Sequence, residues 1–154
     1  MNIQDIKREL ADSPDRDLGS GVDEQAVLQA ESALGVLFPP QYRRFLARFG
    51  SGFVSSEEFI GLGGPRHLDV AWLTIELRSR KKDFPKSLIP IRADGFGNYD
   101  CLDSNNPTSD GEFPVVVWVH DGGANQHHRI LAPSFDDWFI NMLRLVKELD
   151  ANEE

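Results

Sequence analysis

The chain has 154 residues, 27% of them charged, and its formal net charge is -9 at pH 7. This acidic balance argues against direct binding of nucleic acid, which depends on clustered Lys and Arg, and it favours a basic protein as partner. One cysteine, Cys101, excludes an intrachain disulfide, and a chain of this length needs neither a disulfide nor a metal to fold.

The N-terminus shows no targeting pattern, because no basic segment followed by an apolar run opens the chain. No stretch approaches the roughly 18 consecutive apolar residues that a membrane-spanning helix requires. We therefore expect a cytoplasmic protein without membrane contact. No internal repeat is visible, and we expect one domain over residues 1–154.

Helical periodicity dominates the first third of the chain. Apolar residues spaced between Ile3 and Leu10 predict a short amphipathic helix, and the polar segment 12–21 after it predicts a flexible connection. A second helix is predicted from its ends, because Asp23 suits the N-cap position and Gly35 suits the C-terminal stop.

A third helix is predicted to begin at Pro40, since proline is favoured in the first turn of a helix. Its apolar stripe ends before Gly50. Arg43, Arg44 and Arg48 occupy the opposite face, which we expect to be solvated.

The rest of the chain alternates strand and helix patterns. Residues 70–77 predict a short helix, and the basic segment 78–83 after it predicts a solvated loop. A capping box at Ser134 and Asp137 predicts the start of the last helix. Strands are predicted near 53–62, 88–92, 99–103, 113–120 and 129–132. The fold class is therefore α+β, a mostly antiparallel sheet of about five strands with helices packed on it.

The stretch 89–103 predicts a β-hairpin with a glycine-bearing tip. Gly95 and Gly97 accept positive φ and let the chain fold tightly around Phe96. We expect acceptors at Asp94, Asn98 and Asp103 to point outward, although Asp and Asn are also common simply because they form turns. The candidate partner-binding residues are Asp94, Phe96, Asn98, Tyr99, Asp103 and Asp121.

A competing interpretation of the same hairpin stays open. It buries Phe96 and Tyr99 inside the hairpin and places the partner contact at Asp121 or at the Glu57-Glu58 loop.

Catalytic signals are weak. His120, Asp121, His127 and His128 could form a metal site, but their spacing is not the His-x-x-x-His spacing that puts two imidazoles on one helix face. Cys101 lies in a predicted strand beside acidic residues, which disfavour a thiolate. We expect no enzyme activity and no cofactor, and a metal-dependent hydrolase that uses those four residues is the alternative.

Four segments, in this order along the chain, resemble blocks of the SUKH superfamily. The first is Glu31–Gly50, in which Leu34-Gly35 ends a helix and Tyr42 and Phe45-Leu46 follow a proline pair. Phe38 stands where the family usually has Leu, and Phe-Gly-Ser-Gly at 49–52 stands where Asn-Gly-Gly is usual. The other blocks are 90–103, 116–121 and 132–138, and the resemblance covers about residues 22–145.

The resemblance implies a function as well as a fold. Bacterial SUKH proteins act largely as immunity proteins that neutralise polymorphic toxins, often nucleases or deaminases. It therefore implies a protein-binding module that meets a toxin domain directly, and the acidic composition fits a basic toxin. A regulatory scaffold like the fungal members is a further alternative.

Overall fold

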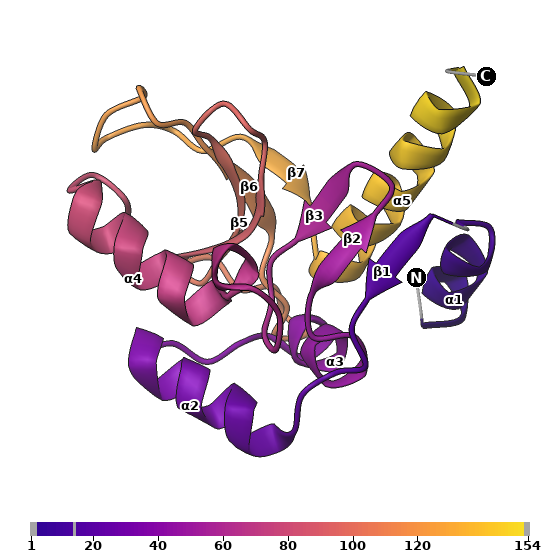
Figure 1. Cartoon of the computed structure of the whole chain (residues 1–154). Helices are drawn as coiled ribbons and strands as arrows, with labels where there is room; N and C mark the ends of the chain where they lie inside the picture. The colour runs from indigo at the N-terminus through magenta and orange to yellow at the C-terminus, as the bar shows by residue number, and fades with distance from the viewer. Residues whose placement is uncertain (1–2, 14, 153–154) are drawn as a thin grey trace.

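The computed structural model describes residues 3–13 and 15–152 and contains, within them, five α-helices and two antiparallel sheets (Figure 1). In chain order the elements are α1 (Ile3–Ala11), β1 (Arg16–Leu18), α2 (Glu24–Leu34), α3 (Pro40–Arg48), β2 (Gly52–Val54), β3 (Glu57–Phe59), the 3-10 helix η1 (Arg66–Leu68), α4 (Val70–Arg80), β4 (Leu88–Ala93), β5 (Tyr99–Asp103), β6 (Val115–Trp118), β7 (Ile130–Ala132) and α5 (Phe135–Asn152). The α+β prediction is confirmed. No helix in this part of the chain is long and apolar enough to cross a membrane.

Helices α2 and α5 begin where local sequence rules place them, whereas α4 runs to Arg80, three residues into the segment 78–83 that was predicted to be a solvated loop. The carboxylate of Asp23 accepts a hydrogen bond from Ala26 N at 2.9 Å, which caps α2, and Gly35 ends that helix with φ 69°. Ser134 and Asp137 are hydrogen-bonded through their side chains at 3.2 Å at the start of α5. These contacts are local in sequence, which explains why the helices were predictable.

The predicted single sheet is instead two sheets, with strand orders β1-β2-β3 and β4-β5-β6-β7. The segment near 53–62 forms the hairpin β2–β3, and its neighbour is β1, where Arg16 pairs with Val54. The prediction of a flexible connection over 12–21 is therefore wrong at β1, while residue 14 lies outside the described residues. A polar three-residue strand shows no periodicity, so its partner could be found only in the folded chain.

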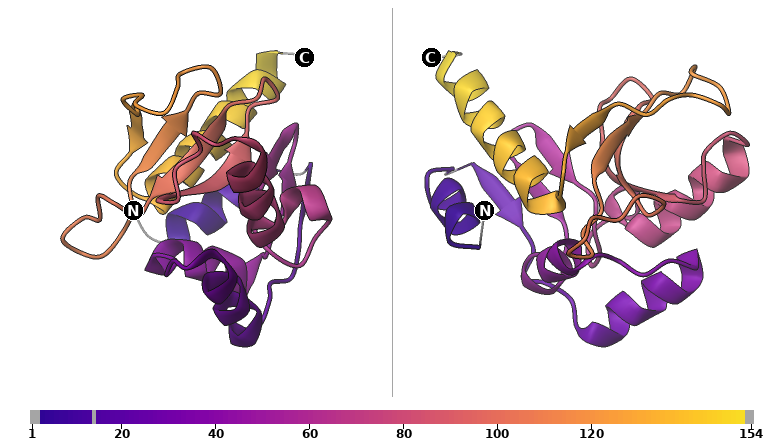
Figure 2. Two further views of the ribbon diagram at one scale, coloured as in Figure 1. Left: turned by 90° about the vertical axis from the view of Figure 1, so that its left-hand side faces the viewer. Right: turned by 180° about the vertical axis from the view of Figure 1, so that it is seen from behind.

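The four-stranded sheet lies between two helices, with α4 over one face and α5 over the other (Figure 2). An aromatic cluster fills the space where α3 and α5 meet the three-stranded sheet. In it, Phe59 and Phe139 have ring centroids 5.0 Å apart, and Phe45 and Phe139 lie 5.4 Å apart. Edge-to-face pairs of this kind add to the stabilisation from burial.

The arginines of α3 are less solvated than their sequence pattern predicts. Arg43 pairs with the buried Glu31 at 2.7 Å, and Arg44 pairs with the buried Asp136 at the start of α5. Arg48 alone among the three is exposed. The helical pattern gives the face on which these side chains lie, but it does not show which carboxylates meet that face.

Arg92 joins the two sheets and α5. Its guanidinium binds Glu57 of β3 at 2.7 Å and Asp100 of β5 at 3.3 Å, and Asp100 also accepts a hydrogen bond from Trp138 Nε1 at 3.0 Å. Ile60 N donates to Ile91 O at 3.0 Å beside it. Burial raises the pKa of Asp100, although Trp138 and Arg92 act in the opposite direction.

Cys101 is fully buried in β5, and burial raises the pKa of its thiol well above the usual value. We expect this thiol to be unreactive toward a disulfide reagent such as dithionitrobenzoate in the folded protein. The same reagent should react with one thiol per chain after unfolding in guanidinium. Prompt reaction under native conditions would show that the cysteine is accessible and the prediction is wrong.

Candidate functional site

Two loops lie together at one end of the four-stranded sheet (Figures 1 and 2). We call them the tip: residues 94–98 between β4 and β5, and residues 119–129 between β6 and β7. Asn98 Oδ1 accepts a hydrogen bond from His120 N at 3.1 Å, which connects the two loops. Gly97 sits so close to the His120 ring that a Cβ there would lie 2.9 Å from Cδ2. Asp121 is thus beside the hairpin loop, as the predicted binding set requires.

Asp94 organises the hairpin loop from inside. Its Oδ1 accepts hydrogen bonds from Phe96 N at 2.7 Å and Asn98 N at 3.1 Å, and its Oδ2 accepts one from Asn98 Nδ2 at 2.9 Å. Burial raises the pKa of Asp94, but these hydrogen bonds outweigh it and leave the pKa below its usual value. The expected outward orientation of the Asp94 and Asn98 acceptors is wrong, because the Asp94 oxygens bind within the turn and Asn98 Oδ1 accepts from His120 N of the second loop.

The two aromatic residues of the hairpin differ in exposure. Phe96 is 81% exposed at the apex, where the flanking Gly95 and Gly97 have φ values of 87° and 93°. Tyr99 is half-buried, and its ring centroid lies 6.4 Å from that of Trp118. The exposure of Phe96 agrees with the first interpretation, and the half-buried Tyr99 agrees fully with neither.

Asp103 lies away from the tip. It pairs with Leu88, at the opposite end of the β4–β5 ladder from Tyr99, and is only 7% exposed. Its Oδ1 accepts from Asn105 N at 3.0 Å and its Oδ2 accepts from Asn106 Nδ2 at 2.7 Å. The expectation that its carboxylate points outward is wrong, because the carboxylate organises the turn that follows β5.

The second loop of the tip is held by Gln126, a residue outside the predicted binding set. Its amide nitrogen donates to Val119 O at 2.8 Å and to Gly123 O at 3.0 Å, and its amide oxygen accepts from Val119 N at 2.9 Å. A glutamine in a polar loop carries no pattern that signals this role. The contacts hold the loop that presents the exposed Asp121.

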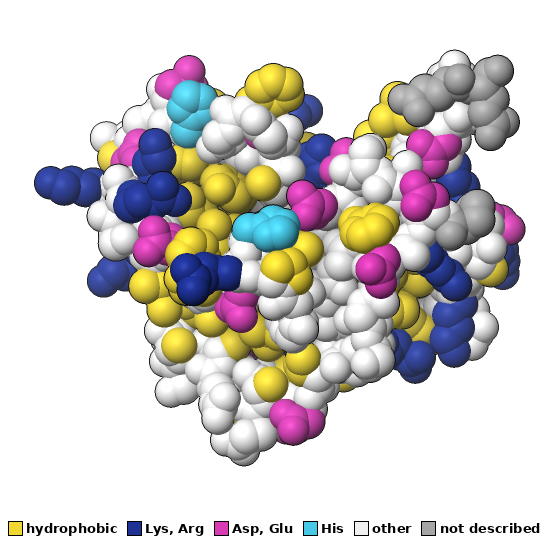
Figure 3. Space-filling view, in the orientation of Figure 1, with side chains coloured by type: hydrophobic (Ala, Val, Ile, Leu, Met, Phe, Trp, Pro, Cys, Tyr) yellow, Lys and Arg dark blue, Asp and Glu magenta, His cyan; other side chains and the backbone are white. Residues whose placement is uncertain are grey.

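The charge around the tip is mixed rather than uniformly acidic. Burial raises the pKa of Tyr99, and the positive charge of Arg80 at the end of α4 acts against this rise. Lys and Arg side chains gather on the side of the molecule that carries α4 (Figure 3). Asp121 is the exposed carboxylate of the predicted set, since Asp94 and Asp103 bind within their own loops.

The histidine-rich loop does not form a metal centre in the described part of the chain, where no three His, Cys, Asp or Glu side chains are grouped to hold an ion. His120, Asp121, His127 and His128 are therefore not assembled in the way that the hydrolase alternative requires. His120 instead contributes its backbone N–H and its ring to the packing of the tip.

Comparison with known proteins agrees with this architecture. The sequence pattern of the SUKH_5 family, described as SMI1-KNR4 cell-wall, matches residues 2–144. The chain belongs to this SUKH family. The match covers every strand of both sheets and most of α5 in this SUKH protein.

Solved structures show the same fold, and 18 chains match this SUKH protein. One is the crystal structure of a protein from Pseudomonas syringae pv. tomato, with a TM-score of 0.56 and 22% sequence identity, covering 77% of this chain and 84% of that chain. At that identity the similarity concerns the fold alone. No curated protein matches.

Proposed function

We propose that this SUKH protein is a protein-binding module that acts as an immunity protein. It binds a basic toxin domain, a nuclease or a deaminase, through the tip and neutralises it without turnover. One observation carries the proposal: Phe96 is 81% exposed on a loop that three hydrogen bonds to the Asp94 carboxylate hold in place. A pre-ordered aromatic ring loses little freedom on binding, which is the property of an interface anchor.

Charge supplies the long-range part of the interaction. The net charge of -9 attracts a cationic protein and raises its rate of association, with Asp121 placed beside the Phe96 loop. Attraction alone would be promiscuous. Specificity comes from the packed ring within the polar rim, and the bound module occupies the space where an anionic substrate would approach the toxin.

The Phe96→Ala substitution tests the anchor. We expect it to raise the dissociation constant roughly 30-fold or more, because truncating a hot-spot residue costs about 2 kcal/mol or more. The measurement is calorimetric titration with a basic toxin domain chosen from the genes next to the one for this chain. Leu37→Ala is the matched control, since Leu37 is 74% exposed between α2 and α3 and should bind like wild type.

Two further measurements test the binding site and the immunity function independently. Wild-type protein should protect cells that express the toxin domain. The Asp121→Lys substitution should lower the association rate and make that rate less dependent on salt concentration. Unchanged affinity in Phe96→Ala, or an equal loss in Leu37→Ala, would move the contact away from the tip. Wild-type protein that neither binds nor protects would exclude the immunity function itself.

A further inference from the structure

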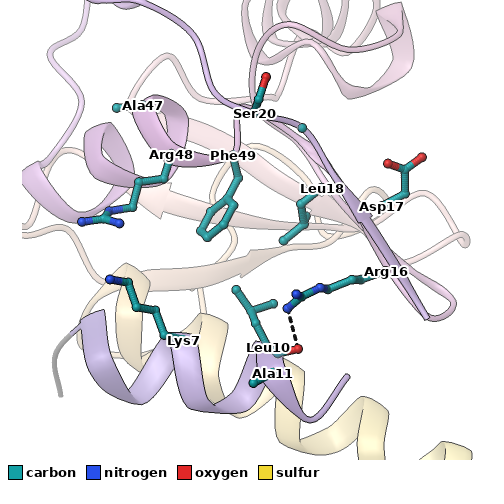
Figure 4. A pocket seen from close by; sticks show the side chains of 11 residues that line it. Lys7, Leu10, Ala11, Arg16, Asp17, Leu18, Ser20, Ala47, Arg48 and Phe49 are labelled. Atoms are coloured by element: carbon teal, nitrogen blue, oxygen red, sulfur yellow. Dashed lines mark hydrogen bonds between the residues drawn. The ribbon is translucent and has the colours of Figure 1, made fainter. Parts of the chain in front are cut away.

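We propose a second binding site in this protein, a groove between α1, β1 and α3 that takes a small organic anion with an apolar body. The groove encloses about 530 Å³ (Figure 4). Its chemically distinctive lining consists of Lys7, Leu10, Arg16, Leu18, Arg48 and Phe49. The volume falls within the range of about 300–1,000 Å³ that is typical of small-molecule sites.

Regular secondary structure turns these side chains toward one space. Lys7 and Leu10 lie three residues apart on α1 and therefore share a helix face. In β1, alternation puts Arg16 and Leu18 on the groove side and directs the Asp17 carboxylate away from it (Figure 4). The single acidic side chain of the lining thus does not enter the groove.

The floor of the groove is apolar. Leu10 is buried, while Leu18 and Phe49 are half-buried and pack against the core, with the Phe49 ring centroid 5.8 Å from that of Phe45. Water contacts the partly exposed faces of Leu18 and Phe49 in the free protein. An apolar group that covers these faces would therefore bind favourably. A purely inorganic anion would leave this surface wet.

The rim of the groove is cationic. Lys7 from α1 and Arg48 from α3 extend toward the same opening, and Arg16 lies across the groove, where its Nη1 donates to Leu10 O at 2.5 Å (Figure 4). Within the described residues, none of these three side chains forms an ion pair. Positive charge is therefore concentrated at one place on a chain that has 25 acidic and only 16 basic residues.

Cations of α5 bind two of the carboxylates near this rim, Glu9 and Asp12, and Arg8 binds a third, Asp5. Glu9 of α1 pairs with Arg144 at 3.2 Å and with Lys147 at 2.5 Å, and Lys147 also lies 3.5 Å from Asp12. The groove therefore keeps a positive field over an apolar floor. A carboxylate between Lys7 and Arg48, carrying a hydrophobic body over Phe49, satisfies both features.

The test is an NMR titration of the full-length, isotopically labelled protein with phenylbutyrate. Saturable shifts are expected at the backbone amides of residues 7–11, 16–20 and 47–49. The neutral phenylbutanol and inorganic phosphate should each bind about tenfold more weakly or worse, since each lacks one of the two contributions. Equal binding of phenylbutanol, or shifts outside these segments, would overturn the proposal.

Charge-reversal variants provide the second arm of the test. Lys7→Glu and Arg48→Glu change exposed side chains, so the fold should persist, and each should weaken phenylbutyrate binding about tenfold or more. Lys81→Glu is the control, because this exposed lysine follows α4. An equal effect of all three variants, or no effect of the first two, would exclude the site. Phe96→Ala should leave phenylbutyrate binding unchanged, so this proposal and the proposed function can fail separately.

Discussion

Replacing Trp138 with alanine should lower the free energy of unfolding by about 3–5 kcal/mol, the loss typical of truncating a buried tryptophan. Trp138 is 3% exposed, and its ring centroid lies 5.8 Å from that of Phe59 and 5.6 Å from that of Phe135. Trp118 is fully buried against Phe84, and Trp118→Ala should cause a similar loss. Urea unfolding followed by circular dichroism measures both.

Phenylalanine variants at the same positions separate packing from hydrogen bonding. Trp138 Nε1 donates to the Asp100 carboxylate, whereas Trp118 Nε1 has no hydrogen-bond partner among the described residues. Trp138→Phe should therefore destabilise the protein by about 1–3 kcal/mol more than Trp118→Phe does. Alanine variants as stable as wild type would show that the rings do not lie in the core.

The Arg92→Met substitution should lower the free energy of unfolding by about 3–5 kcal/mol at neutral pH. The reason is that Glu57 and Asp100 would remain in a largely buried environment without the cation that now contacts both. Arg80→Met is the matched control, because Arg80 forms only an exposed pair with Glu76 and should change stability by about 0.5 kcal/mol or less. Equal losses in the two variants would contradict a special role for Arg92.

The pH dependence of this loss follows from Asp100. Burial raises its pKa in the folded protein, so the folded state holds the proton more tightly than the unfolded state does. The stabilising contribution of the protonated form is complete below the ordinary pKa of about 4 and is lost as the pH rises through the folded pKa. Removing Arg92 raises that pKa further. The loss of unfolding free energy in Arg92→Met should therefore shrink as the pH is lowered from 7 toward about 4. A loss that grows over this range would refute this account.

Short-range signals in the amino-acid sequence predict most of the local elements of this protein. Caps such as Asp23 and Ser134 and stops such as Gly35 act within a few residues, so the helices α2 and α5 could be located without a fold. The turn at 94–98 was also predictable, because glycine adopts positive φ readily and this preference does not depend on the rest of the fold. The apolar run around Val115–Trp118 correctly indicated an inner strand.

Which segments and charges meet depends instead on how the folded chain packs. The pairing of Arg16 with Val54 spans a long stretch of chain, and the predicted strands fall into two sheets because β3 does not pair with β4. The same holds for Arg44 with Asp136, and for the groove where Lys7, Arg16 and Arg48 converge. The sequence pattern shows on which face of a helix or strand a side chain lies. The partner of that side chain depends on which element packs against that face. For that reason the aromatic apex could be predicted from residues 89–103, whereas the cationic groove could not.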